Sequence, residues 1–550
     1  MDENPTWKTR LDASLIERYE REGLWSGVTL ARCAAQRAAE APDLVAAVDR
    51  TGAVGFATLH AQAQWLAAAL AERGLRPGDV VSFQLPNWHE AMVINLAACL
   101  GGYVCNPIIP IYRDAEVGYI LRHAHTRVFF IPRSFRSIDY LEMVRRLQPG
   151  LPALRDVVLV GDEGPAPDGC LRFQDLLRAV EPRPFPPVDP NAVKLLLFTS
   201  GTTGDPKGVL HSHNTIRAEM EAVMRFWSIR RSDVVLMPSP VTHITGYLYA
   251  LELAFAAGVK VVLMEKWDAA QAWELIERHG ATFTIAATPF LIELSAEVER
   301  RGIGLPSMRL FGSGGAPVPE AVVARARAAL PACQVFRVYG SSEAPTVTLG
   351  VREGDPPSLG GTTDGAICNH EVRIVDPETG QPVATGAEGE IVTRGPEVML
   401  GYTKPQYTQE AFDAEGFFHT GDLGFVDARG YITISGRKKD LIIRGGENIS
   451  PKEIEDLLHQ HAAVQEAAVV AMPHARLGET PCACVVLRPG AQLELAGLVA
   501  FLDAARLARQ KFPERLLVLE ELPRTASGKV LKHVLRKRLA DEAAAGAAAA

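Results

Sequence analysis

Residues 195–208 read Leu-Leu-Leu-Phe-Thr-Ser-Gly-Thr-Thr-Gly-Asp-Pro-Lys-Gly in a chain of 550 residues. The apolar run 195–198 predicts a buried strand, and a loop rich in glycine and hydroxyl groups follows it. Three glycines, four hydroxyl side chains and one lysine fall within residues 199–208. Glycine lets backbone N–H groups approach an anion, hydroxyls add hydrogen-bond donors, and lysine adds a positive charge. We therefore predict a polyphosphate-binding loop made by Thr199, Ser200, Gly201, Thr202, Thr203, Gly204 and Lys207.

This loop is not a Walker A loop. Pro206 stands where that pattern has its second glycine, and Gly208 replaces the Ser or Thr that follows its lysine. The alternative is an ordinary polar turn, which would not need this concentration of glycine, hydroxyl and lysine side chains. The composition favours the phosphate loop.

Strands and helices alternate along most of the chain. Helical patterns cover 59–75 and 89–100, and short apolar runs occupy 80–85, 128–131, 156–160 and 260–264. Continuously apolar strands separated by helices are typical of parallel sheets that are buried on both faces. The predicted fold class is α/β.

Composition excludes several classes of protein. Hydrophobic residues make up 47% and charged residues 22%, which is ordinary globular usage, and the net charge of −8 offers no broad basic surface to nucleic acid. The eight cysteines contain no C-x-x-C pair, so we expect neither a disulfide framework nor a zinc site.

The first residues carry no signal-peptide pattern. Glu252 and Lys260 interrupt the longest apolar stretch, 246–264, which predicts a buried helix and a strand rather than a membrane span. We expect a cytoplasmic protein without integral membrane contact.

The pattern of hydrophobic and polar residues changes after Glu388. Residues 389–393 and 431–435 alternate like antiparallel strands, and the polar, glycine-led run 436–440 has the character of a hinge. We predict a large N-terminal domain (1–436) of packed α/β sheets plus a β-subdomain, a small mobile α+β C-terminal domain (437–540) and a disordered tail (541–550). A capping box at 450–453 predicts a helix start in the small domain. The proline-rich run 181–190 is either a surface loop or a second boundary, and we favour the loop.

The loop at 199–208 and five further motifs resemble those of the adenylate-forming superfamily, which includes acyl-CoA synthetases, peptide-synthetase adenylation domains and luciferases. The further motifs are Gly-Ser-Gly-Gly-Ala-Pro at 312–317, Tyr-Gly-Ser-Ser-Glu at 339–343, His-Thr-Gly-Asp at 419–422, Gly-Arg-Lys-Lys-Asp at 436–440 with Gly-Gly-Glu-Asn-Ile at 445–449, and Pro-Arg-Thr-Ala-Ser-Gly-Lys at 523–529. They occur in the family's order over nearly the whole chain. The resemblance implies a two-step ligase, in which a carboxylate attacks the α-phosphate of ATP and a thiol, most often that of CoA, then displaces AMP.

The resemblance also implies roles for individual residues. Glu343 is similar to the family's Mg²⁺ ligand, Asp422 and Arg437 to its ribose contacts, and Lys439 to its hinge residue. Lys529 resembles the lysine that reaches the carboxylate and the α-phosphate, and with His243 and Lys207 it completes the catalytic set. The remaining nucleotide contacts implied are Gly315, Ala316, Pro317, Tyr339, Gly340, Ser341 and Ser342, where Ser342 replaces the family's usual threonine. Gly445 and Gly446 lie in the loop expected on the CoA side.

The acid pocket implied by the resemblance contains His243, Ile244, Gly246 and Gly314. None of these is an acid that could pair with an amino group, which disfavours amino-acid activation. His243 is either the residue that gates the acid and thiol sites or a packed core histidine. The surrounding stretch 237–247 resembles bacterial ligases of medium-chain, alicyclic or aryl acids, cyclohexanecarboxylate–CoA ligase among them.

Several alternatives remain open at the level of sequence. The favoured activity is acid–CoA ligation, with the carboxylic acid, ATP and CoA as small-molecule partners. A free-standing enzyme that loads a carrier protein, a luciferase-like oxidase and a non-enzymatic nucleotide-binding relative are the other three. The assembly could be a homodimer.

Overall fold

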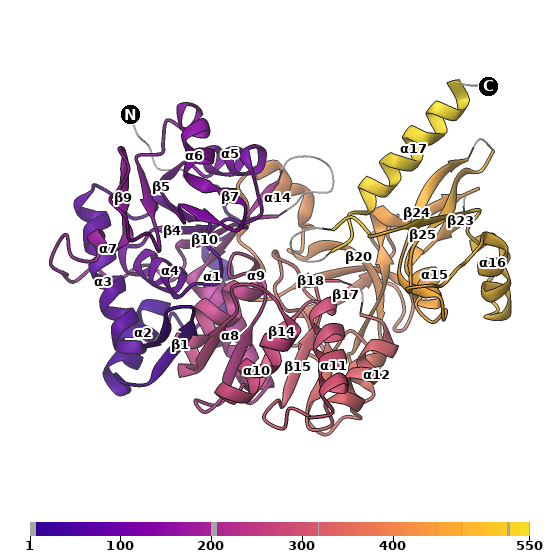
Figure 1. The fold of residues 1–550 in the computed structure, drawn as a ribbon, viewed down its shortest axis with the longest axis horizontal. Coiled ribbons are helices and arrows are strands. Elements are labelled where there is room, and N and C mark those ends of the chain that lie inside the picture. Colours follow the sequence, from indigo (N-terminus) through magenta and orange to yellow (C-terminus); the bar gives the residue numbers. More distant parts are fainter. Residues whose placement is uncertain are drawn as a thin grey trace.

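A computed structural model of the chain describes residues 7–199, 206–316, 318–445, 447–474, 476–524 and 529–548, without the side chains of Asn448 and of residues 543–548. Ser200, Gly201, Thr202, Thr203, Gly204, Pro317 and Gly446, all singled out above, lie outside the described residues. A large body contains most of the chain, and a smaller C-terminal body, orange to yellow, lies beside it (Figure 1).

Two sheets organise the large body. The first has the strand order β16-β15-β14-β12-β13-β1-β2 and is parallel except at the β1–β2 hairpin. Its strands are β1 (Val45–Asp49), β2 (Gly52–Gly55), β12 (Val234–Met237), β13 (Lys260–Leu263), β14 (Phe283–Ala286), β15 (Leu310–Ser313) and β16 (Gln334–Arg337).

The second sheet has the order β19-β11-β10-β4-β3-β5-β8-β9. It is parallel from β10 to β9, whereas β11 runs antiparallel to both β10 and β19. Its strands are β3 (Val80–Phe83), β4 (Val104–Pro107), β5 (Thr126–Ile131), β8 (Asp156–Leu159), β9 (Cys170–Arg172), β10 (Val193–Thr199), β11 (Lys207–Ser212) and β19 (Gly401–Tyr402). A two-stranded hairpin, β6 (Ser134–Phe135) and β7 (Ile138–Asp139), lies apart from it.

Helices between the sheets form a shared core. Residues of α2 (Leu30–Glu40), α3 (Phe56–Glu72), α4 (His89–Gly101) and α8 (His213–Phe226) belong to one apolar cluster with strand residues of both sheets. The outer face of the second sheet packs on α5 (Asp114–His123) and α6 (Tyr140–Leu147). The outer face of the first sheet packs on α10 (Ala269–His279), α11 (Thr288–Arg301) and α12 (Glu320–Ala329). This layering explains why the strands are apolar on both faces.

A four-stranded antiparallel sheet forms the β-subdomain. Its order is β17-β18-β20-β21, with β17 (Glu371–Val375), β18 (Gly389–Arg394), β20 (Phe418–Val426) and β21 (Ile432–Arg437). The last strand ends at Arg437 and leads into a 3-10 turn, Lys438–Asp440, which begins the smaller body. Sequence alternation after Glu388 predicted this antiparallel texture.

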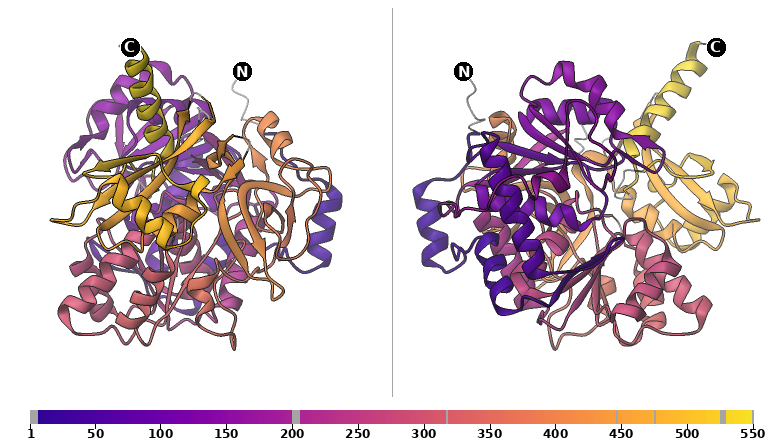
Figure 2. Two further views of the ribbon diagram at one scale, coloured as in Figure 1. Left: turned by 90° about the vertical axis from the view of Figure 1, so that its right-hand side faces the viewer. Right: turned by 60° about the vertical axis from the view of Figure 1, so that its left-hand side comes forward.

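The smaller body combines a sheet with helices. Strands β22 (Ile442–Arg444), β23 (Glu447–Ile449), β24 (Val464–His474), β25 (Gly478–Leu487) and β26 (Arg515–Leu519) pack with α15 (Pro451–Leu458), α16 (Leu495–Ala504) and α17 (Lys532–Ala548). Figure 2 (left) shows this body in front of the larger one.

The remaining elements are α1 (Ala13–Arg21), α7 (Phe173–Leu176), α9 (Ile244–Gly246), α13 (Leu359–Thr362), α14 (Pro405–Ala411), two π-helical segments (Tyr247–Glu252 and Ala254–Gly258) and 3-10 turns at Gln148–Gly150 and Arg509–Lys511.

The structure can be compared directly with several local predictions. The run 181–190 is a loop that leads into β10, as favoured. The stretch 246–264 is a buried helix followed by β13, and no helix among the described residues is long and apolar enough to cross a membrane. All eight cysteines are free thiols, and Cys482 and Cys484 are buried in β25.

Two local predictions need correction. Helix α15 begins at Pro451 as predicted, but the Ser450 side chain does not cap it; its hydroxyl donates to the Ser435 carbonyl at 2.5 Å instead. The tail expected to be disordered from residue 541 is helical through Ala548, because the alanine-rich end continues α17.

The boundary between the two bodies predicts a proteolytic pattern. Lys438 lies in the connecting turn and its side chain is 47% exposed, so brief trypsin treatment should first cut after Lys438. Mass spectrometry should then find fragments 1–438 and 439–550. Stable halves produced by a first cut near residue 185 would contradict this division of the chain.

Candidate active site

The two ends of the predicted phosphate loop lie side by side. Thr199 ends β10 and Lys207 begins β11, and the two residues are paired in the antiparallel ladder. The Thr199 hydroxyl donates to the Lys207 carbonyl at 3.4 Å. The hairpin therefore holds the ends of the loop together, as a phosphate loop requires.

Two tyrosines support the Lys207 ammonium. Lys207 Nζ lies 5.1 Å from the Tyr402 ring centroid and 4.7 Å from that of Tyr407. Tyr402 belongs to β19, which pairs with β11, and Tyr407 to α14. Cation–π attraction of this kind orients an ammonium without neutralising it. The two rings therefore hold the Lys207 ammonium at the start of β11.

The Glu343 carboxylate lies beside the same tyrosine. The Tyr402 hydroxyl donates to Glu343 Oε1 at 2.8 Å, and the backbone N–H of Met399 donates to the Glu343 carbonyl at 2.8 Å. The Ser341 hydroxyl oxygen accepts from the N–H groups of Glu343 and Ala344, both at 3.2 Å. The loop 339–343 is therefore held at both its backbone and its carboxylate.

A buried histidine fixes the neighbouring residue of this loop. His211 Nε2 donates to the Ser342 carbonyl at 2.8 Å. Burial lowers the pKa of His211 to about 4, so the ring is neutral near physiological pH. A neutral ring that donates from Nε2 leaves Nδ1 as acceptor for the Thr215 hydroxyl, which lies 3.1 Å away. Strand β11 thus carries both Lys207 and the residue that fixes Ser342.

Tyr339, Asp422 and Arg437 form one bonded group. Asp422 and Arg437 are paired across β20 and β21, and their side chains form an ion pair at 2.6 Å. The Tyr339 hydroxyl donates to the other Asp422 oxygen at 2.9 Å. Asp422 is only 4% exposed. Burial alone would lower the pKa of Arg437, but the Asp422 carboxylate raises it.

Two lysines of the smaller body lie in the same electric field. Loss of solvent, and then the Arg437 charge, lower the pKa of Lys529 to about 8. The same two causes lower the pKa of Lys439 to about 8, although Lys439 as a residue is exposed. Lys529 is also close enough to His243 to affect it: burial, and then the Lys529 charge, lower the pKa of His243 to about 4. The charges of Arg437 and Asp422 therefore act on Lys529, and the Lys529 charge acts on His243.

His243 begins the segment expected to bind the acid. It is the N-cap of α9, and its Nδ1 accepts from the Thr245 N–H at 3.4 Å. Two glycines make close backbone contacts here: a Cβ on Gly246 would lie 2.1 Å from the Pro240 carbonyl oxygen, and one on Gly314 would lie 2.4 Å from that of Val338. A larger residue at either position would displace the backbone. Gly315, Ala316 and Gly340 are also described, whereas Pro317 is not.

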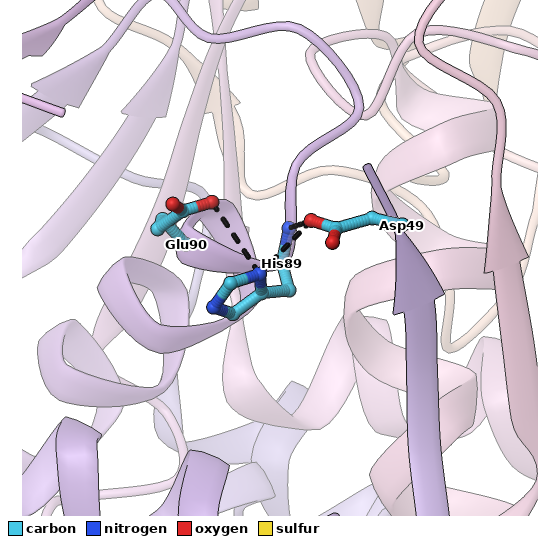
Figure 3. Close-up of side chains that lie close together, drawn as sticks. All are labelled: Asp49, His89 and Glu90. Carbon is cyan, nitrogen blue, oxygen red and sulfur yellow. Dashed lines mark hydrogen bonds and ion pairs between the residues drawn. The ribbon is translucent and has the colours of Figure 1, made fainter. Parts of the chain in front are cut away.

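A separate acidic cluster could suggest a metal site. Asp49, His89 and Glu90 lie within reach of one another (Figure 3). However, Arg50 already neutralises it, since its guanidinium pairs with Glu90 at 2.9 Å and with Asp49 at 3.4 Å. His89 directs its backbone N–H and its Nδ1 to the same Asp49 oxygen, both at 2.9 Å. These bonds lower the pKa of Asp49 although burial opposes them. We assign this cluster a structural role.

The whole-chain comparisons agree with this geometry. Residues 34–403 match the AMP-binding enzyme family, and residues 453–529 match the AMP-binding enzyme C-terminal domain. The chain belongs to the AMP-binding enzyme family. The resemblance drawn from the six motifs is confirmed.

Relatives in this family act on different acids. The chain is 38% identical to the medium-chain fatty-acid–CoA ligase of Escherichia coli K12, over 94% of this chain and 92% of that protein. It is 33% identical to a CoA ligase of Rhodococcus jostii RHA1 whose named acyl group is a propanoyl chain that carries a methyl-dioxo-octahydroindenyl ring system. This match covers 92% of this chain and 98% of that protein. It is 32% identical to the vibriobactin-specific 2,3-dihydroxybenzoate-AMP ligase of Vibrio cholerae, over 96% of both.

Solved structures of the family share the whole fold. ATP-bound MatB from Rhodopseudomonas palustris superposes with a TM-score of 0.83 at 30% identity, over 93% of this chain and 99% of that one. The anthranilate CoA ligase AuaEII with anthranoyl-AMP gives 0.86 at 25% identity, over 95% and 98%. The α/β fold with a C-terminal subdomain is confirmed.

Sequence reasoning did not identify every residue of the site. Tyr402, Tyr407 and His211 support the family's motif residues from β19, α14 and β11. Tyr402 and Tyr407 lie about two hundred residues beyond Lys207, and nothing in the local sequence connects them with the loop. His211 stands four residues after Lys207 and could have been inspected, but a lone histidine in an apolar strand has no pattern of its own.

Proposed function

We propose that this enzyme activates a medium-chain, alicyclic or aryl carboxylic acid with ATP and transfers it to CoA. The chain is an AMP-forming acid–thiol ligase of its family, and its relation to CoA ligases over more than nine tenths of its length carries the proposal. The charges of Arg437 and Asp422 act on Lys529, which supports its assignment to the adenylation step. The choice of acid class comes from the named relatives and from the lack of an acid at Ile244, Gly246 and Gly314.

Adenylation needs positive charge around the reacting oxygens. One carboxylate oxygen of the acid attacks the α-phosphorus of ATP, and the bond to pyrophosphate breaks. In our proposal Lys207 and the loop from Thr199 hold the phosphates, and Lys529 faces the α-phosphate and the acid. A cation at this point stabilises the transition state more than the bound substrates, because charge builds up on those oxygens.

The nucleoside would occupy the group around Asp422. We assign the ribose hydroxyls to Asp422 and Arg437, because a carboxylate accepts from both hydroxyls. The Tyr339 ring would stack on adenine, with Gly315, Ala316, Gly340, Ser341 and Ser342 around it. The bonds from Tyr339 and Arg437 hold the carboxylate in place before the nucleotide arrives.

Thiol transfer needs the smaller body to move. In our proposal it rotates about Lys439, which carries Lys529 away and brings Gly445 and Gly446 toward the CoA thiol. The thiol sulfur attacks the acyl carbon and AMP leaves. With a pKa of about 4, His243 is too weak a base to deprotonate a thiol efficiently, so we assign it to gating and packing.

We assign Mg²⁺ to Glu343. Mg²⁺ in nucleotide sites takes one or two carboxylates together with phosphate oxygens and water, and Glu343 is a lone acid close to the Lys207 loop. Its Oε1 accepts from Tyr402, which leaves Oε2 to serve as the ligand. When bound, Mg²⁺ would neutralise phosphate charge. A cytoplasmic location and homodimer assembly stay predictions.

Carrier-protein loading is the second candidate. Relatives named 2,3-dihydroxybenzoate-AMP ligase and salicyl-AMP ligase / salicyl-S-ArCP synthetase match at 32% and 33% identity. Pyrophosphate release should be measured over acids of graded length and ring type, with and without CoA. We expect sustained, CoA-dependent turnover with acyl-CoA as product. A single turnover to enzyme-bound acyl-adenylate that CoA does not accelerate would favour the carrier-loading enzyme.

The role of Lys529 predicts a split between the two half-reactions. Lys529→Ala should slow adenylation by a hundredfold or more, about 3 kcal/mol, because a transition-state donor is lost. Transfer from supplied acyl-adenylate to CoA should largely survive, since the lysine has moved away in that step. Both rates are measured by quenched-flow. The control is Lys532→Ala, which removes the lysine three residues after Lys529. The Lys532 ammonium pairs with Glu455. Adenylation within a few-fold of wild type in Lys529→Ala would refute this role.

The contact between Tyr402 and Glu343 predicts a changed metal requirement. Tyr402→Phe removes the hydrogen bond to the carboxylate, and bonds to charged groups contribute about 1.5–3 kcal/mol. The Mg²⁺ concentration for half-maximal adenylation should rise about tenfold. Tyr407→Phe is the matched control, because its ring also lies beside Lys207 while the bond to Glu343 comes from Tyr402. Equal Mg²⁺ requirements in the two variants would argue against the assignment.

A further inference from the structure

The segment between β12 and β13 contains the residues assigned above to the acid pocket. It leaves β12 at Met237, turns through 238–243, and continues as α9 and the π-helical segment Tyr247–Glu252. It has no strand partner between Met237 and His243, so its backbone groups must bond elsewhere. π-Helical turns are rare and occur frequently at functional sites.

One asparagine side chain bonds to this turn and to the last residue of β12, whose carbonyl also accepts from the Met264 N–H at 3.0 Å. Asn87 Nδ2 donates to the Met237 carbonyl at 3.2 Å and to the Ser239 carbonyl at 2.9 Å. Asn87 Oδ1 accepts from the Val241 N–H at 2.9 Å. Asn87 is 5% exposed, so water does not compete for these groups. A single amide thus makes three bonds to alternate residues of the turn that leads to His243.

The asparagine is itself held from two sides. It immediately precedes α4, whose first residue, His89, is bonded to Asp49 at the end of β1 (Figure 3). Between them, the Trp88 indole donates to Glu265 at 2.6 Å, and the Arg50 guanidinium lies 3.6 Å from the Trp88 ring. The acidic cluster described above therefore anchors the turn that presents Asn87.

The same helix contacts the other end of the segment. Asn95, two turns further along α4 and fully buried, donates from Nδ2 to Glu252 at 2.8 Å and accepts from the Tyr247 hydroxyl at 2.7 Å. Glu252 is also paired with Lys194 of β10 at 2.7 Å. Strand β10 ends at Thr199, where the phosphate loop begins. The π-helical segment is thus connected to the strand that carries the phosphate loop.

We propose that Asn87 and Asn95 are positioning residues that fix the acid-binding segment from both ends and thereby set which acids the enzyme accepts. The proposal rests on the function proposed above. His243, Ile244 and Gly246 lie between the two attachment points, so a shift of the segment moves all of them together. Buried hydrogen-bonded amides restrict the backbone to one position more strictly than apolar packing does.

Asparagine is suited to this task by its chemistry. Its amide presents two donors and an acceptor on one planar group, which matches two carbonyls and one N–H in residues 237–241. Aspartate has nearly the same shape but no donors. Asn87→Asp would therefore keep the packing and the bond from Val241 while it places a carboxylate oxygen against the Met237 and Ser239 carbonyls.

The test compares acid selectivity in three proteins: wild type, Asn87→Asp and Asn106→Asp. Asn106 is the matched control because it is a fully buried amide of β4 whose Nδ2 donates to the Ser82 hydroxyl at 2.8 Å, away from the segment. The measured quantity is kcat/KM over a series of straight-chain, alicyclic and aryl acids, with the KM for ATP alongside. In Asn87→Asp the ratio between the best and the poorest acid should fall about tenfold, with a raised KM for acid and an unchanged KM for ATP. Asn106→Asp should keep the wild-type ratio.

A second variant covers the other attachment point and the case in which Asn87→Asp folds poorly. Tyr247→Phe removes only the hydroxyl that bonds to Asn95, and its selectivity ratio should fall at least about threefold. Folding is followed by thermal unfolding of each variant. Unchanged selectivity ratios in the folded variants, with only the unfolding temperature reduced, would overturn the proposal.

Hydrogen exchange separates this proposal from the proposed function. Exchange of the backbone amides in 237–252 needs no substrate and should increase in Asn87→Asp but not in Asn106→Asp. A wild-type enzyme that consumes no acid of the series would refute the proposed function, while the exchange result would still decide whether Asn87 holds the segment. Unchanged exchange in a folded Asn87→Asp variant would refute the proposal even if the ligase activity is confirmed.

Discussion

The Asp422 carboxylate is the point at which three parts of the molecule meet. It lies on β20 of the β-subdomain and accepts a hydrogen bond from Tyr339, which follows the last strand of the first sheet in the chain. It also pairs with Arg437, the last residue before the connecting turn. Lys529 of the smaller body lies within its electric field. A buried carboxylate is costly unless it is paired and hydrogen-bonded, and here both conditions are met by residues from different elements. The Asp422 carboxylate therefore joins the β-subdomain to Tyr339 and to the end of the strand that leads into the smaller body.

Positive charge collects around this carboxylate. Partial loss of solvent and the charge of Arg437 lower the pKa values of Lys439 and Lys529, whereas the charges of Asp422 and Asp440 oppose this shift. Arg536 of α17 pairs with Asp440 at 2.9 Å, which leaves Asp440 less able to balance the lysines. In the function proposed above, the phosphates of ATP would add negative charge to this group. In the same proposal, bound ATP would favour the position in which Lys529 is inside the site.

Local sequence was sufficient to predict helices and strands, but it was insufficient to predict which side chains contact one another across the fold. The apolar run before Thr199 predicted strand β10, because strand propensity acts over a few residues, whereas the pairing of β10 with β11 was not predicted. The start of α15 at Pro451 was predicted for the same reason, yet Ser450 bonds to Ser435 across the connecting turn, since a hydroxyl takes the nearest carbonyl in the fold. The contact between Tyr402 and Glu343 joins residues far apart in sequence, and no local pattern encodes it. Motif resemblance named the polar residues of the site, whereas the asparagines that hold the acid-binding segment emerged only from the structure.

The most direct measurement is the titration of the Lys529 ammonium. Nuclear magnetic resonance of ¹⁵N-lysine-labelled enzyme, with the signal assigned by Lys529→Arg, reports the side-chain pKa in the absence of substrates. If Lys529 lies buried beside Arg437, desolvation and repulsion favour loss of its proton, and the pKa should be about 8, well below the ordinary 10.5. Addition of ATP should raise the value, because phosphate favours the charged form. A pKa near 10.5 that does not respond to ATP would show a solvated lysine outside the site and would contradict the account.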